Sequence, residues 1–376
     1  MGSHCAMIMR ALPCFSSKQS FLIDEYASED SYAYPKVATW KSHGEGSDCC
    51  SWDGVECDRE TGHVIGLHLA SSCLYGSINS SSTLFSLVHL RRLDLSDNDF
   101  NYSEIPHGVS QLSRLRSLNL SDSQFSGQIH RSFKTWLEKS GSKFDPLKET
   151  SSKPGNQSPK SFVSCWIGPI FTWSPYPAVL LDLSYNFFSG PIPSFLANLT
   201  TLTYLSLTSN NFSAGTLAWL ESIDWSDPIL AHEPHPIDRI ISSGKQIRRI
   251  SLLSYTSTNA TLPKFKLLGL ASCNLTEFPD FLQNQQELEV LILSTNKIHG
   301  PIPKWMWNIS KETLEALFLS NNFLSGFSQV PDVLPWSRMS ILELSSNMLQ
   351  GSLPVPPSST VEYQSLEIDW LEKFHL

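Results

Sequence analysis

The feature that most constrains the fold of this 376-residue chain is a repeated template of apolar residues. The template reads L-x-x-L-x-L-x-x-N-x-L/F-x-G-x-I/L-P, and neighbouring copies follow each other every 23 to 26 residues. Units this short cannot bury an apolar face alone, so they fold by stacking into a solenoid. The second leucine of the nine copies falls at Leu67, Leu93, Leu118, Leu181, Leu205, Leu268, Leu291, Leu317 and Leu342.

The spacing within each copy predicts a short strand followed by a turn. Both leucines of the L-x-L element point inward, the x residues point outward, and successive strands form one parallel sheet at about 4.8 Å per repeat. The asparagine sits where the chain leaves the strand, and its amide can bond buried backbone groups along the stack. Ser123 and Cys273 replace it in two copies. The predicted asparagine ladder consists of Asn98, Asn186, Asn210, Asn296, Asn322 and Asn347.

Two irregular segments interrupt the template, and they set the predicted organisation of the chain. They are either island loops inserted between repeats or the remains of damaged repeats, and the incomplete copies beside the first segment favour the second interpretation. Because stacking on nearest neighbours supplies most of the stability of a solenoid, we expect two semi-independent blocks. The predicted segments are a cap (1–63), repeats (64–130), an irregular segment (131–178), repeats (179–220), an irregular segment (221–246), repeats (247–354) and a tail (355–376).

The cap contains an adjacent cysteine pair and two tryptophans that we expect to be packing residues, Trp40 and Trp52. Cys50 and Cys57 enclose a short loop that favours a disulfide in an oxidising compartment. Cys49 then needs an upstream partner, for which Cys14 and Cys5 are the candidates. Zinc is the rival interpretation, although adjacent ligands fit the usual spacings poorly. Its ligands would be Cys49, Cys50, Cys57 and His63.

Short helices are expected at both ends of the array. One would cover residues 18–26 of the cap. The other would cover residues 361–376, where Leu366, Trp370, Leu371 and Phe374 form an apolar face that can close the last layer.

Three phrases resemble the plant leucine-rich-repeat receptor-like proteins of the disease-resistance type. They are Asp48-Cys-Cys-Ser-Trp-Asp-Gly-Val-Glu-Cys-Asp58, the run at residues 253–263, and Ile302-Pro-Lys-Trp-Met-Trp-Asn308. The resemblance implies an α/β leucine-rich-repeat solenoid with its parallel sheet on the concave face and a disulfide-containing amino-terminal cap. It also implies that Cys50 pairs with Cys57 and Cys49 with Cys14.

By the same resemblance, the chain belongs to an ectodomain at the cell surface or in the apoplast. Such receptors bind a peptide, protein or glycan ligand and signal through a kinase-bearing co-receptor, here in pathogen perception. The chain has no apolar run long enough to span a membrane and no convincing signal peptide, so we expect a truncated ectodomain. The alternatives are a secreted inhibitor of cell-wall-degrading enzymes, similar to polygalacturonase-inhibiting proteins, and a non-functional degenerate fragment.

Composition and motifs exclude several other functions. The net charge is 27 − 36 = −9, which argues against a nucleic-acid partner. The chain has no H-E-x-x-H, Walker, G-x-S-x-G or kinase motif, so we expect neither catalysis nor a cofactor.

Glycosylation sequons point to the secretory pathway. Further sequons at Asn119 and Asn156 accompany those we expect to carry glycans, and a glycan on Asn119 would obstruct the concave face. The expected glycosylation sites are Asn79, Asn101, Asn198, Asn211, Asn259, Asn274 and Asn308.

The outward-facing residues of the strands form the predicted recognition surface, because a concave sheet that carries charges and aromatics suits a peptide or protein ligand. The candidate ligand-binding residues are Arg92, Asp94, Asp97, Arg116, Tyr185, Tyr204, Phe318 and Glu343.

Overall fold

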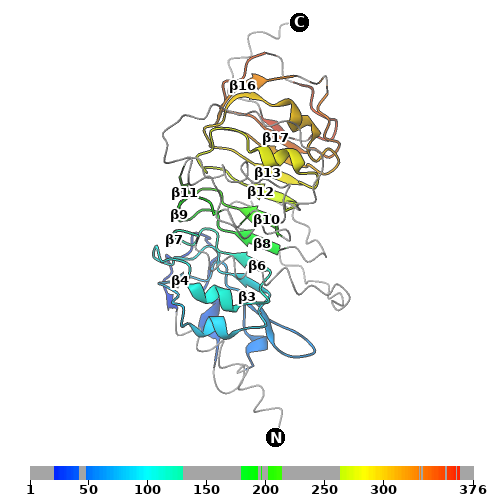
Figure 1. Cartoon of the computed structure of the whole chain (residues 1–376). Coiled ribbons are helices and arrows are strands. Elements are labelled where there is room, and N and C mark those ends of the chain that lie inside the picture. Colours follow the sequence, from blue (N-terminus) through cyan, green and yellow to red (C-terminus); the bar gives the residue numbers. More distant parts are fainter. Residues whose placement is uncertain are drawn as a thin grey trace, which may run out of the picture.

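The computed structural model describes residues 21–41, 48–129, 179–193, 196, 202–213, 263–329, 331, 333–351, 354–360 and 362–364. One eleven-stranded sheet extends along the molecule, and its strands are stacked in chain order (Figure 1). All neighbours pair in parallel except β2 and β3, which pair antiparallel. The strands are β2 (Val55–Cys57), β3 (Val64–His68), β5 (Arg92–Asp94), β6 (Ser117–Asn119), β8 (Val179–Asp182), β10 (Leu202–Ser206), β12 (Leu267–Gly269), β13 (Val290–Ile292), β15 (Ala316–Phe318), β17 (Ile341–Glu343) and β18 (Glu362–Gln364).

The repeated leucines build the core of the predicted solenoid, and this confirms the fold class. Parallel pairing places the second leucine of each copy beside its equivalent in the next, as in Leu67 against Leu93 and Leu291 against Leu317. All nine of these leucines are at most 5% exposed. A single apolar cluster extends from Phe21 to Leu349.

The sheet does not break where the template is interrupted. β6 pairs directly with β8, and β10 pairs directly with β12, each in the register that aligns the central leucines. The irregular segments 131–178 and 221–246 lie outside the described residues. Strand pairing thus continues across both interruptions, and the expected division into two semi-independent blocks stays a prediction.

The ladder asparagines connect neighbouring coils through their amides. Asn296 donates to the carbonyl oxygens of Leu270, Leu293 and Ser294, and its Oδ1 accepts the backbone N–H groups of Cys273 and Leu275. Each of the other five donates to a carbonyl of the preceding coil and accepts from a backbone N–H: Asn98, Asn186, Asn210, Asn322 and Asn347.

Ser123 and Cys273, which replace asparagine in the ladder, form some of the same contacts with the preceding coil. Ser123 Oγ donates to the carbonyl of Leu95 at 2.8 Å, and Cys273 Sγ contacts the carbonyl of Leu207 at 3.5 Å. Both groups reach the preceding coil, but a hydroxyl or thiol has fewer donors and acceptors than an amide.

The opposite side of the coil is built from short strands and 3-10 helices. The backbone turns at glycines with positive φ, such as Gly127 at 83° and Gly190 at 77°, a region that favours glycine. The elements are β7 (Ser126–Gly127), β9 (Phe187–Gly190), β11 (Asn211–Phe212), β14 (His299–Ile302), β16 (Phe323–Phe327), η3 (Thr83–Ser86), η4 (His107–Gln111), η7 (Asp280–Asn284) and η8 (Lys304–Asn308).

The cap covers the first layer of the core. Trp40 and Trp52 are buried and stacked, with ring centroids 5.2 Å apart, beside η1 (Lys36–Thr39) and η2 (Cys49–Ser51). The helix expected at residues 18–26 is wrong in its described part. Residues 22–23 form strand β1, which pairs antiparallel with β4 (Leu74–Tyr75), because the open edge of β4 offers backbone partners.

The described part of the tail also differs from expectation. β18 pairs in parallel with β17, so residues 362–364 continue the sheet where a helix was expected. The apolar residues of that expected helix, from Leu366 to Phe374, lie outside the described residues. Among the helices that the structure describes, none has the length and apolarity to cross a membrane.

Candidate functional site

The candidate recognition surface is the outward face of the eleven-stranded sheet. On each strand, one outward residue precedes the central leucine and one follows it, and the register aligns these residues in two rows. The first row is Gly66, Arg92, Ser117, Leu180, Tyr204, Leu267, Val290, Ala316 and Ile341. The second row is His68, Asp94, Asn119, Asp182, Ser206, Gly269, Ile292, Phe318 and Glu343.

The end of this surface nearest the cap is a charged network centred on Glu56. Its carboxylate accepts from Arg92 Nε at 3.1 Å and lies 3.3 Å from His68 Nε2. The hydrogen bond with His68 and the contact with Arg92 lower the pKa of Glu56 to about 2, despite partial burial. Arg92 and His68 are therefore already engaged by a residue of β2.

Replacing Glu56 by glutamine is expected to remove a pH-dependent contribution to stability. Because the pKa of the folded-state carboxyl lies below its usual value, its stabilising effect is present above about pH 4.5 and is lost as the pH falls towards about 2. The side chain is 38% exposed, so solvent screening limits the loss to about 1 kcal/mol.

Urea denaturation of both proteins at neutral pH and at about pH 2 measures this effect. Glu60→Gln is the matched control, because Glu60 is an exposed acidic residue of the same cap. An equal difference between wild type and Glu56→Gln at both pH values would contradict the assignment.

Two acids, Asp94 and Asp182, occupy the middle of the surface, and Lys36 interacts with Asp94 at longer range. Asp94 Oδ1 accepts from the backbone N–H and hydroxyl of Ser96, and Asp182 Oδ1 accepts the same pair of bonds from Ser184. Within the described residues, neither acid forms an ion pair with a lysine, arginine or histidine. Burial raises the pKa of Asp182, and Asp94 adds to this rise. Tyr204 donates its hydroxyl to Asp182 Oδ2 at 3.2 Å.

Beyond Tyr204 the surface becomes apolar. Leu267, Val290 and Ala316 are at most 4% exposed and form a cluster distinct from the solenoid core. Four half-buried side chains pack around them; we call the seven residues the apolar pad. The half-buried members are Tyr204, Ile292, Phe318 and Ile341. Tyr204 and Phe318 are among the predicted ligand-binding residues, whereas the other five pad residues are not. Their signal, apolar residues at outward positions of successive repeats, is present in the sequence.

The eight predicted ligand-binding residues do not share one environment. Arg92, Asp94, Tyr204, Phe318 and Glu343 lie in the two rows. Two others flank the rows: Arg116 immediately before β6, and Tyr185, 42% exposed, in the turn after β8.

Asp97 is a correction to the predicted surface. It is only 8% exposed and has a φ of 51°, in the turn after β5. Its carboxylate accepts the backbone N–H groups of Glu29 and Asp30, at 2.6 and 3.3 Å. Asp97 therefore anchors the cap and is not displayed for a ligand.

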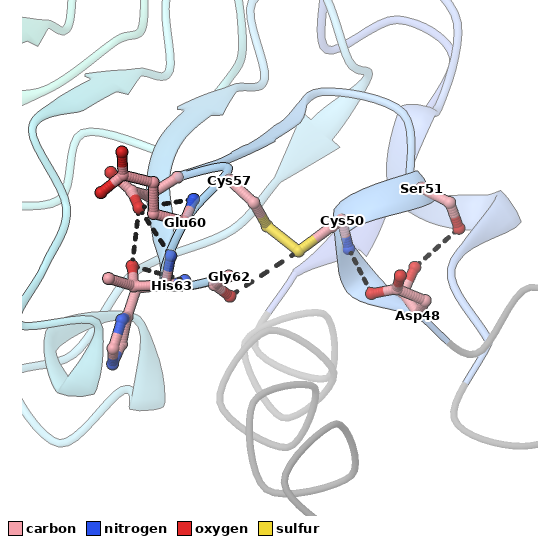
Figure 2. The surroundings of a disulfide bond; sticks show 9 residues. Asp48, Cys50, Ser51, Cys57, Glu60, Gly62 and His63 are labelled. Atoms are coloured by element: carbon pink, nitrogen blue, oxygen red, sulfur yellow. Dashed lines mark hydrogen bonds between the residues drawn. A yellow bond between two sulfur atoms is a disulfide. The ribbon is translucent and has the colours of Figure 1, made fainter. Parts of the chain in front are cut away.

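The cap cysteines form the predicted disulfide between Cys50 and Cys57, with Sγ atoms 2.05 Å apart (Figure 2). The carbonyl of Gly62 lies 3.8 Å from Cys50 Sγ. Cys49 is buried, and its sulfur lies within 4.8 Å of the other two. The disulfide joins two of the four proposed zinc ligands, which rules out that zinc site in this state. Cys14, the predicted partner of Cys49, lies outside the described residues.

The asparagines of the described sequons lie on different faces of the molecule. Asn79, Asn101, Asn211 and Asn308 are exposed and lie off the eleven-stranded sheet, and Asn274 is half-buried. Asn119, by contrast, lies on β6 between Asp94 and Asp182 in the second row, and its Oδ1 accepts from Ser121. Asn156, Asn198 and Asn259 are outside the described part of the chain.

Comparisons with known proteins agree with this architecture. A family model of the leucine rich repeat N-terminal domain matches residues 27–58. A Leucine Rich Repeat model matches residues 89–112, 114–136 and 179–199. The chain is a leucine-rich-repeat protein.

Curated relatives of this leucine-rich-repeat protein are receptor-like proteins of Arabidopsis thaliana. Receptor like protein 27 is 33% identical over 346 residues, covering 86% of this chain and 43% of the relative. Receptor like protein 22 is 32% identical over 356 residues, covering 84% and 43%. The chain thus spans less than half the length of these relatives.

Solved structures support the same fold. The ectodomain of the Arabidopsis receptor kinase HAESA, in complex with an IDA peptide hormone, gives a TM-score of 0.54 at 23% identity, covering 94% of this chain and 51% of its own. The ectodomain of GASSHO1/SCHENGEN3 from Arabidopsis thaliana, in complex with CASPARIAN STRIP INTEGRITY FACTOR 2, gives 0.53 at 22%, covering 92% and 30%. A plant ice-binding protein gives 0.51 at 22%, covering 90% and 81%. At these identities the similarity establishes the fold alone.

Proposed function

We propose that this chain is the extracellular ligand-recognition module of a plant receptor-like protein, acting in pathogen perception and defence signalling through a kinase-bearing co-receptor. The observation that carries the proposal is the continuous outward sheet, which lines up charged, aromatic and apolar side chains over nine repeats. Such a surface suits a ligand that extends across several repeats.

The comparisons supply further support. The relatives are receptor-like proteins that match 82–95% of this chain. The similar HAESA ectodomain binds a peptide hormone, so a peptide is the ligand class that we propose here. A co-receptor and a place at the cell surface belong to the same proposal.

Glycan occupancy tests whether the protein passes through the secretory pathway. We expect enzymatic removal of N-glycans from the native protein in plant extract to lower its apparent mass, with glycans on Asn79, Asn101, Asn211 and Asn308. We expect Asn119 to be unmodified, because a glycan there would cover the centre of the recognition surface. Peptide mass spectrometry assigns each site. An unchanged mass, or full occupancy of Asn119, would contradict the proposal.

A further inference from the structure

The recognition surface has two chemically different parts that lie next to each other. The apolar pad extends over β10 to β17, and the acidic part consists of Asp94 on β5 and Asp182 on β8. Tyr204 joins them, because its ring packs against the pad while its hydroxyl bonds Asp182.

Two ion pairs lie beside the pad, whereas Glu343, in register next to Phe318, forms no ion pair within the described residues. Lys266 Nζ lies 2.8 Å from Glu289 Oε1, and Arg338 pairs with Glu315, at the positions where β12, β13 and β15 begin. At the cap end, Arg92 and His68 are paired with Glu56. Asp94 and Asp182 lie between these groups, and neither forms an ion pair within the described residues, although Lys36 attracts Asp94 at longer range. A cation is the group complementary to both acids.

We propose that the surface binds an extended peptide segment that places a lysine or arginine side chain against Asp94 and Asp182 and apolar side chains on the pad. This inference rests on the proposed function and specifies its ligand chemistry. The pad alone would accept any apolar partner, whereas the acids beside it favour one that also carries a basic side chain.

The fold sets the spacing between the two anchor points. From β8 to β15 there are four strand-to-strand steps, which at about 4.8 Å each give about 19 Å. An extended peptide rises about 3.3 Å per residue, so a basic residue at Asp182 and the apolar residue over Phe318 are about six positions apart.

Selection from a random peptide library displayed on phage, with the disulfide-intact protein as target, tests the proposal. The expected peptides carry a basic residue about six positions from an apolar or aromatic one. Asp182→Asn keeps the oxygen that accepts from Ser184 and removes the charge, so it should weaken binding of these peptides about tenfold. Phe318→Asp should weaken it by about tenfold or more.

Phe323→Asp is the matched control, because Phe323 is 54% exposed on β16, away from the sheet. Loss of binding in Asp182→Asn and Phe318→Asp, with Phe323→Asp unchanged, supports the proposal. Peptides that lack a basic residue, or that bind Asp182→Asn as tightly as wild type, overturn this inference and leave the proposed function standing. Recovery of no binding peptide contradicts both. Asp182→Asn keeps the test valid if Phe318→Asp fails to fold.

Discussion

Replacing Asn296 by alanine is expected to lower the free energy of unfolding by about 3 kcal/mol or more. The amide serves five backbone groups on two coils, and all its hydrogen bonds are buried or partly buried. Each unsatisfied buried group costs about 1–3 kcal/mol, and relaxation of the turn recovers part of the sum. Urea denaturation followed by circular dichroism measures the change.

Asn284→Ala is the matched control for this prediction. Asn284 is exposed at the end of η7, in the coil that precedes Asn296. Its replacement is expected to change stability by about 0.5 kcal/mol or less. Similar losses in both variants would show that the ladder amide has no special role.

Removal of the cap disulfide is expected to have the second-largest effect. The cysteines are seven positions apart, and the chain-entropy model gives about 2.5 kcal/mol for closing so short a loop. The variant Cys50→Ser/Cys57→Ser should therefore unfold at lower urea concentration, and its cap should become sensitive to protease first. The cap covers the first core layer, so its loss exposes apolar side chains that no other repeat protects.

Glu60→Ala is the control for the cap, because Glu60 is an exposed residue three positions after Cys57, and we expect this variant to behave as wild type. Equal stability of the oxidised wild type and the double serine variant would mean that packing of Trp40 and Trp52 holds the cap without the disulfide.

Much of the fold was predictable because its determinants are local and periodic. The leucine spacing gave the nine strands, and the fixed asparagine offset identified the residues that bridge the coils. The disulfide followed from a short loop and from the family resemblance.

The features that were missed depend on contacts between distant segments. Asp97 is buried because backbone N–H groups of residues 29 and 30, far away in the chain, need an acceptor. β1 forms because β4 has an open edge. The sheet is continuous across the irregular segments because β6 pairs with β8 and β10 pairs with β12. No local sequence pattern predicts the register of these pairs.

Only part of the candidate site could be predicted from the sequence, for a related reason. Charged and aromatic residues at outward positions are readily predicted to bind a ligand. Aliphatic residues, by contrast, match the core positions of the template and are assigned to the core. Leu267, Val290 and Ala316 are apolar outward residues in three successive repeats, so only the sheet register shows that they form one surface with Phe318.

Photo-cross-linking of a selected peptide tests the central claim, recognition across the outward sheet, most directly. The peptide carries a photoreactive phenylalanine analogue at its apolar position, and mass spectrometry maps the attachment sites. We expect attachment to the pad, at Ile292, Phe318 and Ile341. Attachment confined to the opposite side of the coil, at η7, η8 or β16, would contradict it.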